Sequence, residues 1–271
     1  MLPPGSTIGI FGGGQLGRMS ATAASRLGYR VHVFTDEEDS PASQVSHNTT
    51  VSLYTNEDDL IRFASIVDVV TFEFENIPVE SLRNIERLVP IYPKPGILEV
   101  TQDRGVEKGF CNSLGIATAP YSLVADVESV TEALRNLKGE GLLKSTRFGY
   151  DGKNQVRVQT GDNLDAAWEQ IGSGPGIVEG WVDYDKEISV IVVRSQSGDI
   201  RCYDAVENEH SNYILHKTSV PAAITKSTEK RAKKIAEALA EHLGLVGVLA
   251  VEMFVMRDGS LIVNEMAPRP H

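Results

Sequence analysis

Residues 248–265 read VLAVEMFVMRDGSLIVNE. Two apolar runs, Val248–Met256 and Leu261–Glu265, flank a glycine-containing turn, and this pattern predicts an antiparallel hairpin. Each run carries an acid, Glu252 in the first and Glu265 in the second. A buried carboxylate is unfavourable unless it is paired or bound to a cation, and oxygen ligands suit a Mg²⁺ ion that also binds substrate phosphates. The stretch therefore predicts a sheet that binds a metal ion, with salt-bridged carboxylates as the alternative.

The second half of the chain around this hairpin is rich in strands. Periodicity predicts one long amphipathic helix there, Thr228–Leu243. The predicted strands before the hairpin are Leu142–Lys144, Gln155–Gln159, Gly176–Val182, Glu187–Arg194 and Ile200–Glu207. This half is therefore expected to be α+β.

The first hundred residues instead alternate short apolar runs with amphipathic stretches. The predicted strands are Thr7–Phe11, Val31–Phe34 and Val67–Phe72, and the predicted helices are Leu16–Leu27, Glu57–Ser65 and Pro78–Leu88. Crossover helices between strands predict a doubly wound α/β unit with a parallel sheet. The proline-rich stretch Pro90–Pro95 and a helix expected from about Leu98 to Leu114 place a domain boundary near residue 100.

A glycine loop, Gly12–Gly17, follows the first predicted strand and opens the first predicted helix, and Asp36 lies nineteen positions beyond Gly17. Backbone amides at such a helix start can bind a phosphate. A dinucleotide, as in an NAD-dependent dehydrogenase, and a tight turn without a ligand both remain open on this motif alone. Gln15 and Leu16 within the loop favour a phosphate monoester.

Charged residues in the middle of the chain are arranged in a way that suits a nucleotide. Lys144 ends an apolar run, and the glycine-containing loop Gly149–Lys153 follows five residues later, so lysine and loop could hold phosphates. Glu179–Val182 and Glu187 could present backbone groups to a purine and carboxylate oxygens to ribose hydroxyls. Each of these residues taken alone would be interpreted as a surface residue.

Composition limits the function classes. The chain of 271 residues has a formal net charge of −11, which argues against a nucleic-acid surface. No apolar run approaches the roughly 18 to 20 residues of a membrane span, and the N-terminus lacks a secretory signal, so we expect no membrane partner and a cytoplasmic location. Cys111 and Cys202 are too few and too far apart to predict a disulfide framework.

Taken in order, Lys144, Gly149–Lys153, Glu179–Val182, Glu187, Glu252, Asn264-Glu265 and Pro268–His271 resemble the ATP-grasp superfamily. Together with Gly12–Met19 and Thr71–Asn76, they resemble the 5-(carboxyamino)imidazole ribonucleotide synthases over essentially the whole chain. The resemblance implies a ribonucleotide-binding pre-ATP-grasp domain at 1–100 and an ATP-grasp domain at 101–271 with a lid at about 118–182. It also implies a further C-terminal domain after His271 and a homodimer in the full-length protein. The sequence departs from the family at Asn154, where the family usually has glycine.

The resemblance also implies the site residues, with ATP and two Mg²⁺ ions as cofactors. ATP would be bound by Arg104, Lys144, Gly149, Tyr150, Asp151, Gly152, Lys153, Asn154, Gln155, Glu179, Gly180, Trp181, Val182, Glu187, His210, Asn264 and Glu265. Mg²⁺ would be bound by Glu252 and Glu265, and the ribonucleotide by Gly14, Gln15, Leu16, Glu75, Tyr150 and Asp151. The catalytic residues would be Asp151, Arg269 and His271.

The expected activity is that of an ATP-dependent carbon–nitrogen ligase of purine biosynthesis. It would carboxylate the amine of 5-aminoimidazole ribonucleotide with bicarbonate, through carboxyphosphate. Three alternatives remain at this point: another ATP-grasp ligase, of the formate-dependent glycinamide ribonucleotide transformylase or biotin carboxylase type; a truncated module that binds ATP without turnover; and, less favoured, a dehydrogenase.

Overall fold

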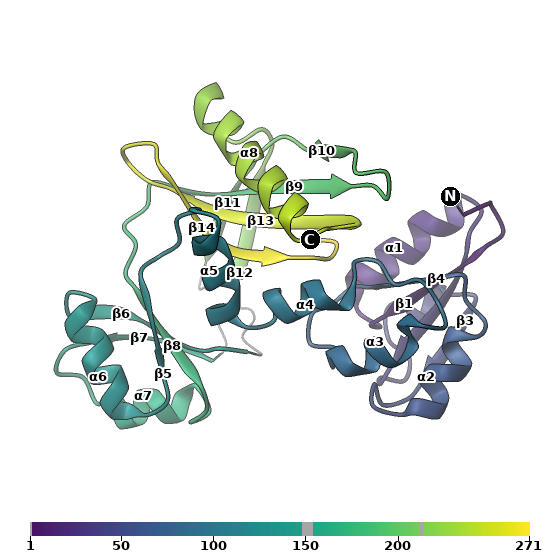
Figure 1. Cartoon of the computed structure of the whole chain (residues 1–271), viewed down its shortest axis with the longest axis horizontal. Helices are drawn as coiled ribbons and strands as arrows, with labels where there is room; N and C mark the ends of the chain where they lie inside the picture. Colours follow the sequence, from purple (N-terminus) through teal and green to yellow (C-terminus); the bar gives the residue numbers. More distant parts are fainter. Residues whose placement is uncertain (1, 148–153, 212–213) are drawn as a thin grey trace.

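The computed structural model describes residues 2–147, 154–211 and 214–271, and its strands form three sheets (Figure 1). One parallel sheet belongs to the first hundred residues. Two antiparallel sheets belong to the rest, and they lie on either side of the helix α5 region (Figure 1). The prediction of an α/β unit followed by an α+β unit is confirmed.

The parallel sheet has the strand order β3-β2-β1-β4. Its elements are β1 (Thr7–Phe11), α1 (Gln15–Arg26), β2 (Arg30–Thr35), the 3-10 turn η1 (Ser43–Val45), β3 (Asn48–Val51), α2 (Glu57–Ala64), β4 (Val69–Phe72) and α3 (Val79–Glu86). Stacked rings of Phe11 and Phe34, with centroids 5.0 Å apart, lie in its core. Strand β3 was not predicted because its residues, Asn-Thr-Thr-Val, form no apolar run.

The single helix expected from Leu98 to Leu114 is wrong. The structure has two helices there, α4 (Pro95–Thr101) and α5 (Arg104–Ser113). Asp103 lies between them with an extended backbone, and its carboxylate accepts hydrogen bonds from the amides of Gly105 at 3.0 Å and Val106 at 3.1 Å. An aspartate that caps the next helix in this way ends the preceding one.

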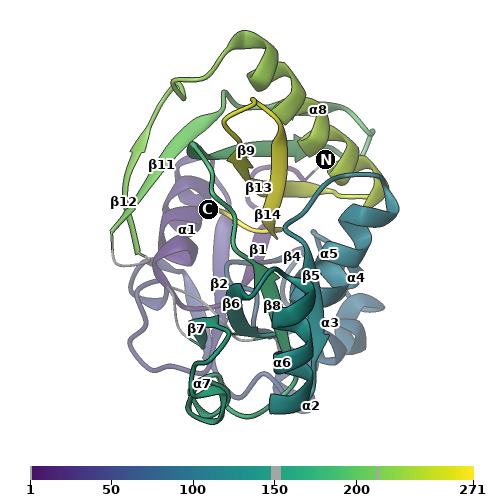
Figure 2. The ribbon, with the colours of Figure 1, turned by 90° about the vertical axis from the view of Figure 1, so that its left-hand side faces the viewer.

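The first antiparallel sheet has the order β5-β8-β6-β7 and carries two helices. Its elements are β5 (Tyr121–Val124), α6 (Val127–Asn136), β6 (Glu140–Ser145), β7 (Gln155–Gln159), α7 (Leu164–Gln170) and β8 (Gly176–Gly180). Val130, Leu143 and Val178 lie in the apolar layer between helices and sheet. This unit projects away from the parallel sheet (Figure 1) and lies below the third sheet when seen from the side (Figure 2).

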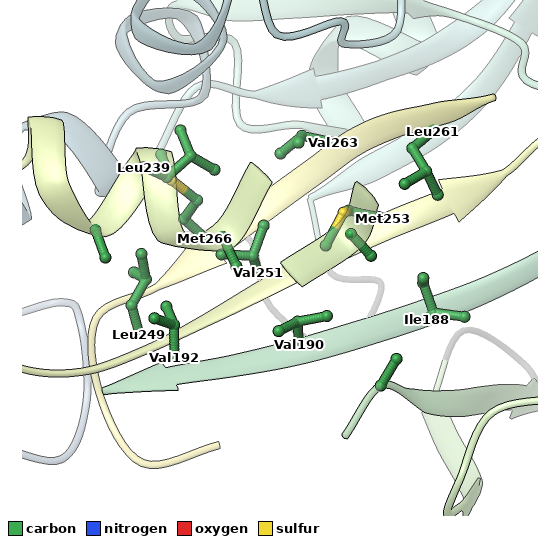
Figure 3. Close-up of a cluster of buried hydrophobic side chains, with 14 of the residues drawn as sticks. Ile188, Val190, Val192, Leu239, Leu249, Val251, Met253, Leu261, Val263 and Met266 are labelled. Atoms are coloured by element: carbon green, nitrogen blue, oxygen red, sulfur yellow. The ribbon is translucent and has the colours of Figure 1, made fainter. Parts of the chain in front are cut away.

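The second antiparallel sheet has the order β12-β11-β9-β13-β14, with β10 on β9. Its elements are β9 (Lys186–Arg194), β10 (Ile200–Cys202), β11 (Val206–Ser211), β12 (Ile214–Ser219), α8 (Lys226–His242), β13 (Gly247–Val255) and β14 (Leu261–Ala267). Helix α8 covers one face, where Leu239 packs over Val192, Leu249 and Val251 (Figure 3). The predicted hairpin is confirmed as β13 and β14.

The single strand expected at Ile200–Glu207 is wrong, because two short strands occur there. Cys202 pairs with Val192 and Val206 pairs with Ser189. Between these two pairs the chain of β10 and β11 advances by four residues, whereas β9 advances by three. One extra residue in an antiparallel pair produces a bulge that interrupts the ladder. Apolar periodicity does not reveal such an insertion.

Candidate functional site

Three acids lie on neighbouring strands of the second antiparallel sheet. Glu252 on β13 is the cross-strand partner of Glu265 on β14, and Glu187 on β9 pairs with Phe254, two residues along from Glu252. Burial, together with the nearby charges of Glu252 and Glu265, raises the pKa of Glu187 to about 7. The mutual repulsion of these carboxylates would be relieved by a cation between them.

Arg104, at the start of α5, supplies one positive charge to this cluster. Its guanidinium lies 3.4 Å from Oε2 of Glu265. Burial alone would raise the pKa of Glu265, but Arg104 and then Lys144 outweigh it, so the pKa lies below its usual value. The carboxylate of Glu265 is therefore ionised and able to bind a cation.

Glu179, at the end of β8, lies between two lysines. Its Oε2 is 3.0 Å from Nζ of Lys144, and its Oε1 is 3.3 Å from Nζ of Lys108. All three side chains are buried. Burial raises the pKa of Glu179, but Lys144 and Lys108 outweigh it and hold the pKa at about 2. The structure thus brings the predicted pair Lys144 and Glu179 together.

Two buried charged residues of this site, Glu107 and Lys108, were not predicted. Both lie on α5, and both contact the backbone of β14. A signal for Lys108 was available, because it follows Arg104 by four residues and so shares its face of a helix. No sequence signal pointed to their main-chain partners, which lie more than 150 residues away.

Other predicted nucleotide residues that the structure describes lie near these charges. His210 on β11 places Nδ1 3.4 Å from Oε2 of Glu187. The amide of Gly180 donates to the carbonyl of Pro120 at 2.7 Å, which fixes the start of the segment that continues to Val182. Trp181 points outward, is 48% exposed, and packs under the guanidinium of Arg157 at 4.1 Å. The side chain of Trp181 therefore faces away from the buried charges.

The end of the chain joins the two halves of the site. Nε of Arg269 lies 2.7 Å from Oε1 of Glu75, which follows β4 of the first domain. Nε2 of His271 lies 2.7 Å from Oε1 of Glu252. That hydrogen bond raises the pKa of His271. The structure thus brings Glu75, Arg269 and His271 close to the acid cluster.

The glycine loop is occupied in part by a residue that was not predicted, Glu73. Its Oε1 accepts from the amide of Gly14 at 2.9 Å and its Oε2 from the amide of Gly17 at 3.1 Å. A Cβ at Gly14 would collide with this carboxylate. Helix geometry leaves the other first-turn amides, those of Gln15 and Leu16, without partners inside the helix. Only those two of the three predicted loop residues can offer an amide to an anion.

Part of the predicted nucleotide loop, Gly149 to Lys153, lies outside the described residues, and this includes the predicted catalytic residue Asp151. Asn154 follows it with a φ of +54°, a left-handed conformation that asparagine tolerates better than most residues. The family that the sequence resembles usually has glycine at this position. Glycine also adopts a left-handed conformation without strain. Gln155 begins β7.

The acid cluster offers a pair of carboxylates to a Mg²⁺ ion. Within residues 2–147, 154–211 and 214–271, no three His, Cys, Asp or Glu side chains form a group ready to hold a metal ion. Mg²⁺ commonly takes one or two carboxylates and completes its shell with substrate phosphates and water. The paired Glu252 and Glu265 fit that mode of binding.

Comparison with known proteins identifies the family. An ATP-grasp domain model matches residues 109–271, and a ribonucleotide synthetase preATP-grasp domain model matches residues 5–102. The N5-carboxyaminoimidazole ribonucleotide synthase of Brucella melitensis is 46% identical over all of this chain and 75% of its own length. The chain belongs to the N5-carboxyaminoimidazole ribonucleotide synthase family. The resemblance stated above to the 5-(carboxyamino)imidazole ribonucleotide synthases concerns this same family, because the two names denote the same enzyme.

Solved structures of this family agree. The Staphylococcus aureus synthetase complexed with ADP matches with a TM-score of 0.94 at 35% identity, covering all of this chain and 72% of its own. The Aspergillus clavatus synthase in complex with ADP and 5-aminoimidazole ribonucleotide matches with a TM-score of 0.88 at 27% identity, covering 99% of this chain and 71% of its own. The family is one of ligases, which excludes the dehydrogenase alternative. Among the described helices, none is long and apolar enough to cross a bilayer.

Proposed function

We propose that the chain carries out the ATP- and bicarbonate-dependent carboxylation of 5-aminoimidazole ribonucleotide to 5-(carboxyamino)imidazole ribonucleotide. The observation that carries the proposal is the junction of Glu75 and Arg269, which sets the first domain against the acid cluster on β9, β13 and β14. A ribonucleotide held on the first domain would there face a nucleotide held on the second. Family membership supports this reaction, and the Aspergillus clavatus synthase binds ADP and 5-aminoimidazole ribonucleotide.

ATP would bind between the two antiparallel sheets. The buried lysine Lys144 and the guanidinium of Arg104 would face phosphates, and Glu187 with His210 would reach the ribose. Phosphoryl transfer depends mainly on positioning and charge neutralisation, with little covalent help from the protein. The cations Arg104 and Lys144 lie near the acids of β9, β13 and β14, and this arrangement suits that chemistry.

Glu252 and Glu265 would hold the Mg²⁺ that accompanies ATP. The ion would neutralise phosphate charge when it is bound. Nε2 of His271 donates to Oε1 of Glu252, which places the imidazole beside a proposed ligand of the ion. Arg269 lies beside it and could stabilise a bicarbonate anion.

The ribonucleotide phosphate would bind at the start of α1. Glu73 takes two amides of the loop, and the amides of Gln15 and Leu16 remain for an anion at the positive end of a twelve-residue helix. Two amides suit one phosphate monoester. Glu75 would then approach the ribose or the base, together with Tyr150 and Asp151.

The chemical steps that we propose are those that the resemblance implies. Bicarbonate oxygen attacks the γ-phosphorus, the bond to ADP breaks, and carboxyphosphate forms. Carboxyphosphate then breaks into CO₂ and phosphate, and the amine nitrogen attacks the carbon of CO₂ and loses a proton. Asp151 is our proposed acceptor of that proton, with His271 assisting. A site closed to water would protect the labile intermediate.

The ATP-binding module without turnover remains a second candidate, favoured by the hydrogen bond of His271 to the proposed metal ligand Glu252. A homodimer, two Mg²⁺ ions and a cytoplasmic location also stay predictions. So does the division into domains at residue 100 with a lid at about 118–182.

A glutamine substitution at Glu265 tests the metal assignment, and turnover by the unsubstituted protein distinguishes the ligase from a module that only binds ATP. Glu265→Gln removes a negative charge that Mg²⁺ requires, so we expect Mg²⁺-dependent ATP turnover to be lost while the protein remains folded. Glu229→Gln, on α8 and away from the cluster, serves as the control and should turn over normally. Retained turnover in the Glu265 variant would refute the metal assignment, and ADP binding without turnover in the unsubstituted protein would favour the module.

A further inference from the structure

Helix α5 holds the strand that carries Glu265 at three successive residues. Nζ of Lys108 donates to the carbonyl of Asn264 at 3.3 Å, and Oε1 of Glu107 accepts from the amide of Met266 at 2.6 Å. Arg104, on the same face of α5, pairs with the carboxylate of Glu265 between them. The backbone on both sides of the proposed metal ligand is therefore fixed by one helix face.

Lys108 makes a second contact, outside that strand. Its Nζ lies 3.3 Å from Oε1 of Glu179 on β8, so one ammonium group joins the first antiparallel sheet to the strand of Glu265. Lys144 pairs with the other oxygen of Glu179. Lys108 thus contacts both Glu179 and the backbone of β14.

Stability alone does not explain this arrangement. Lys108 is 1% exposed, and Glu107 is also buried. Burial raises the pKa of Glu107 well above its ordinary value, because its charge is unfavourable there, and apolar residues of similar volume often stabilise a fold as well as buried ionic groups or better. Buried ionic groups are better suited to fixing one particular geometry, which is the property a two-part binding site needs.

We propose that Lys108 and Glu107 are positioning residues that hold Glu179 and Glu265 at a fixed separation, so that nucleotide and divalent cation bind cooperatively. The proposal rests on the proposed function, because it takes Glu179 as a nucleotide contact and Glu265 as a metal ligand. Coupling of this kind is reciprocal: the cation strengthens nucleotide binding by the factor by which the nucleotide strengthens cation binding.

The test measures that factor directly. The dissociation constant of ADP is determined by calorimetry in EDTA and in MgCl₂, and the ratio of the two is the coupling. Lys108→Met keeps the length of the side chain and removes the charge, and we expect it to lower the ratio about tenfold, or about 1.4 kcal/mol. Lys233→Met, on α8, breaks the two ion pairs with Asp204 and Glu229 instead and should leave the ratio unchanged.

A second pair of variants separates positioning from general loss of stability. Glu107→Gln keeps an oxygen that can accept from the amide of Met266 and should retain the ratio. Glu107→Met removes the acceptor and should lower it. If Lys108→Met does not fold, Lys108→Arg is measured in its place, because it keeps the charge and moves the donors, and it too should lower the ratio.

An unchanged ratio in folded Lys108 or Glu107→Met variants would overturn the proposal, since the lysine and the glutamate would then only stabilise the fold. Failure of ADP to bind to the unsubstituted protein is a different result. It would contradict the proposed function before any question of coupling arises.

Discussion

Glu73 decides how much of the glycine loop is open to a ligand. Its carboxylate is 7% exposed and satisfies the amides of Gly14 and Gly17, at the positive end of α1. A dinucleotide places its pyrophosphate at this end of a helix. Here an internal anion already takes part of it, so the loop resembles a dinucleotide motif in sequence and differs from it in the amides that it offers.

The loop should depend on that carboxylate. Glu73→Ala would leave the buried amide of Gly17 and the partly buried amide of Gly14 without acceptors, and we expect a loss of about 1–3 kcal/mol of unfolding free energy. Glu73→Gln keeps one accepting oxygen and should lose less. Urea unfolding followed by circular dichroism measures both variants, and an alanine variant as stable as the unsubstituted protein would show that the two hydrogen bonds contribute nothing.

His32 predicts a pH dependence of stability. It is buried, its Nε2 lies 2.8 Å from Oγ1 of Thr50, and burial lowers its pKa below the ordinary 6.5. Below pH 6.5 the unfolded chain binds a proton that the folded chain resists, so the contribution of His32 to stability falls as pH drops. His32→Gln should show a smaller loss between pH 7.5 and 5.5 in urea unfolding. A His32→Gln variant that loses as much stability as the unsubstituted protein would contradict this role of His32.

At the scale of elements, apolar periodicity predicted the strands and helices that carry most of the site. The hairpin of β13 and β14 was predictable because two apolar runs and a turn lie next to each other in the sequence. The break between α4 and α5 and the bulge between β10 and β11 were not. The capping hydrogen bonds of Asp103 set the break, and one extra residue opposite β9 makes the bulge. Periodicity carries no information about either.

The cap at Asp103 sets where α5 begins and so where Arg104 points. Asp103→Ala removes the acceptor for two amides and should cost about 1 kcal/mol of unfolding free energy. Asp103→Asn keeps a capping oxygen and should stay close to the unsubstituted protein. Urea unfolding measures both, and equal stability of the alanine and asparagine variants would contradict the assigned role of the cap.

At the scale of the whole molecule, the site is assembled from three sheets. Glu252, Glu265 and Lys144 could be predicted because acids and a lysine on apolar strands are conspicuous. Glu73, Glu107 and Lys108 could not, because their partners are main-chain groups brought close only by the complete fold. The contact of Glu75 with Arg269 joins two distant parts of the sequence, and no pattern in the sequence predicts it.

A ligand that binds only the folded state stabilises it. MgADP at one hundred times its dissociation constant should add about 2.7 kcal/mol to the unfolding free energy, and NADH should add none because two loop amides are taken by Glu73. Thermal unfolding with each nucleotide measures this. Stabilisation by NADH and not by MgADP would contradict the assignment of the nucleotide site.

The most direct test of the central claim is phosphate release by the full-length protein. ATP, bicarbonate and 5-aminoimidazole ribonucleotide are supplied together, and each is then omitted in turn. We predict phosphate release that requires all three, together with formation of the carboxylated ribonucleotide. Release that does not depend on the ribonucleotide, or that is supported instead by formate with glycinamide ribonucleotide or by biotin, would contradict the account.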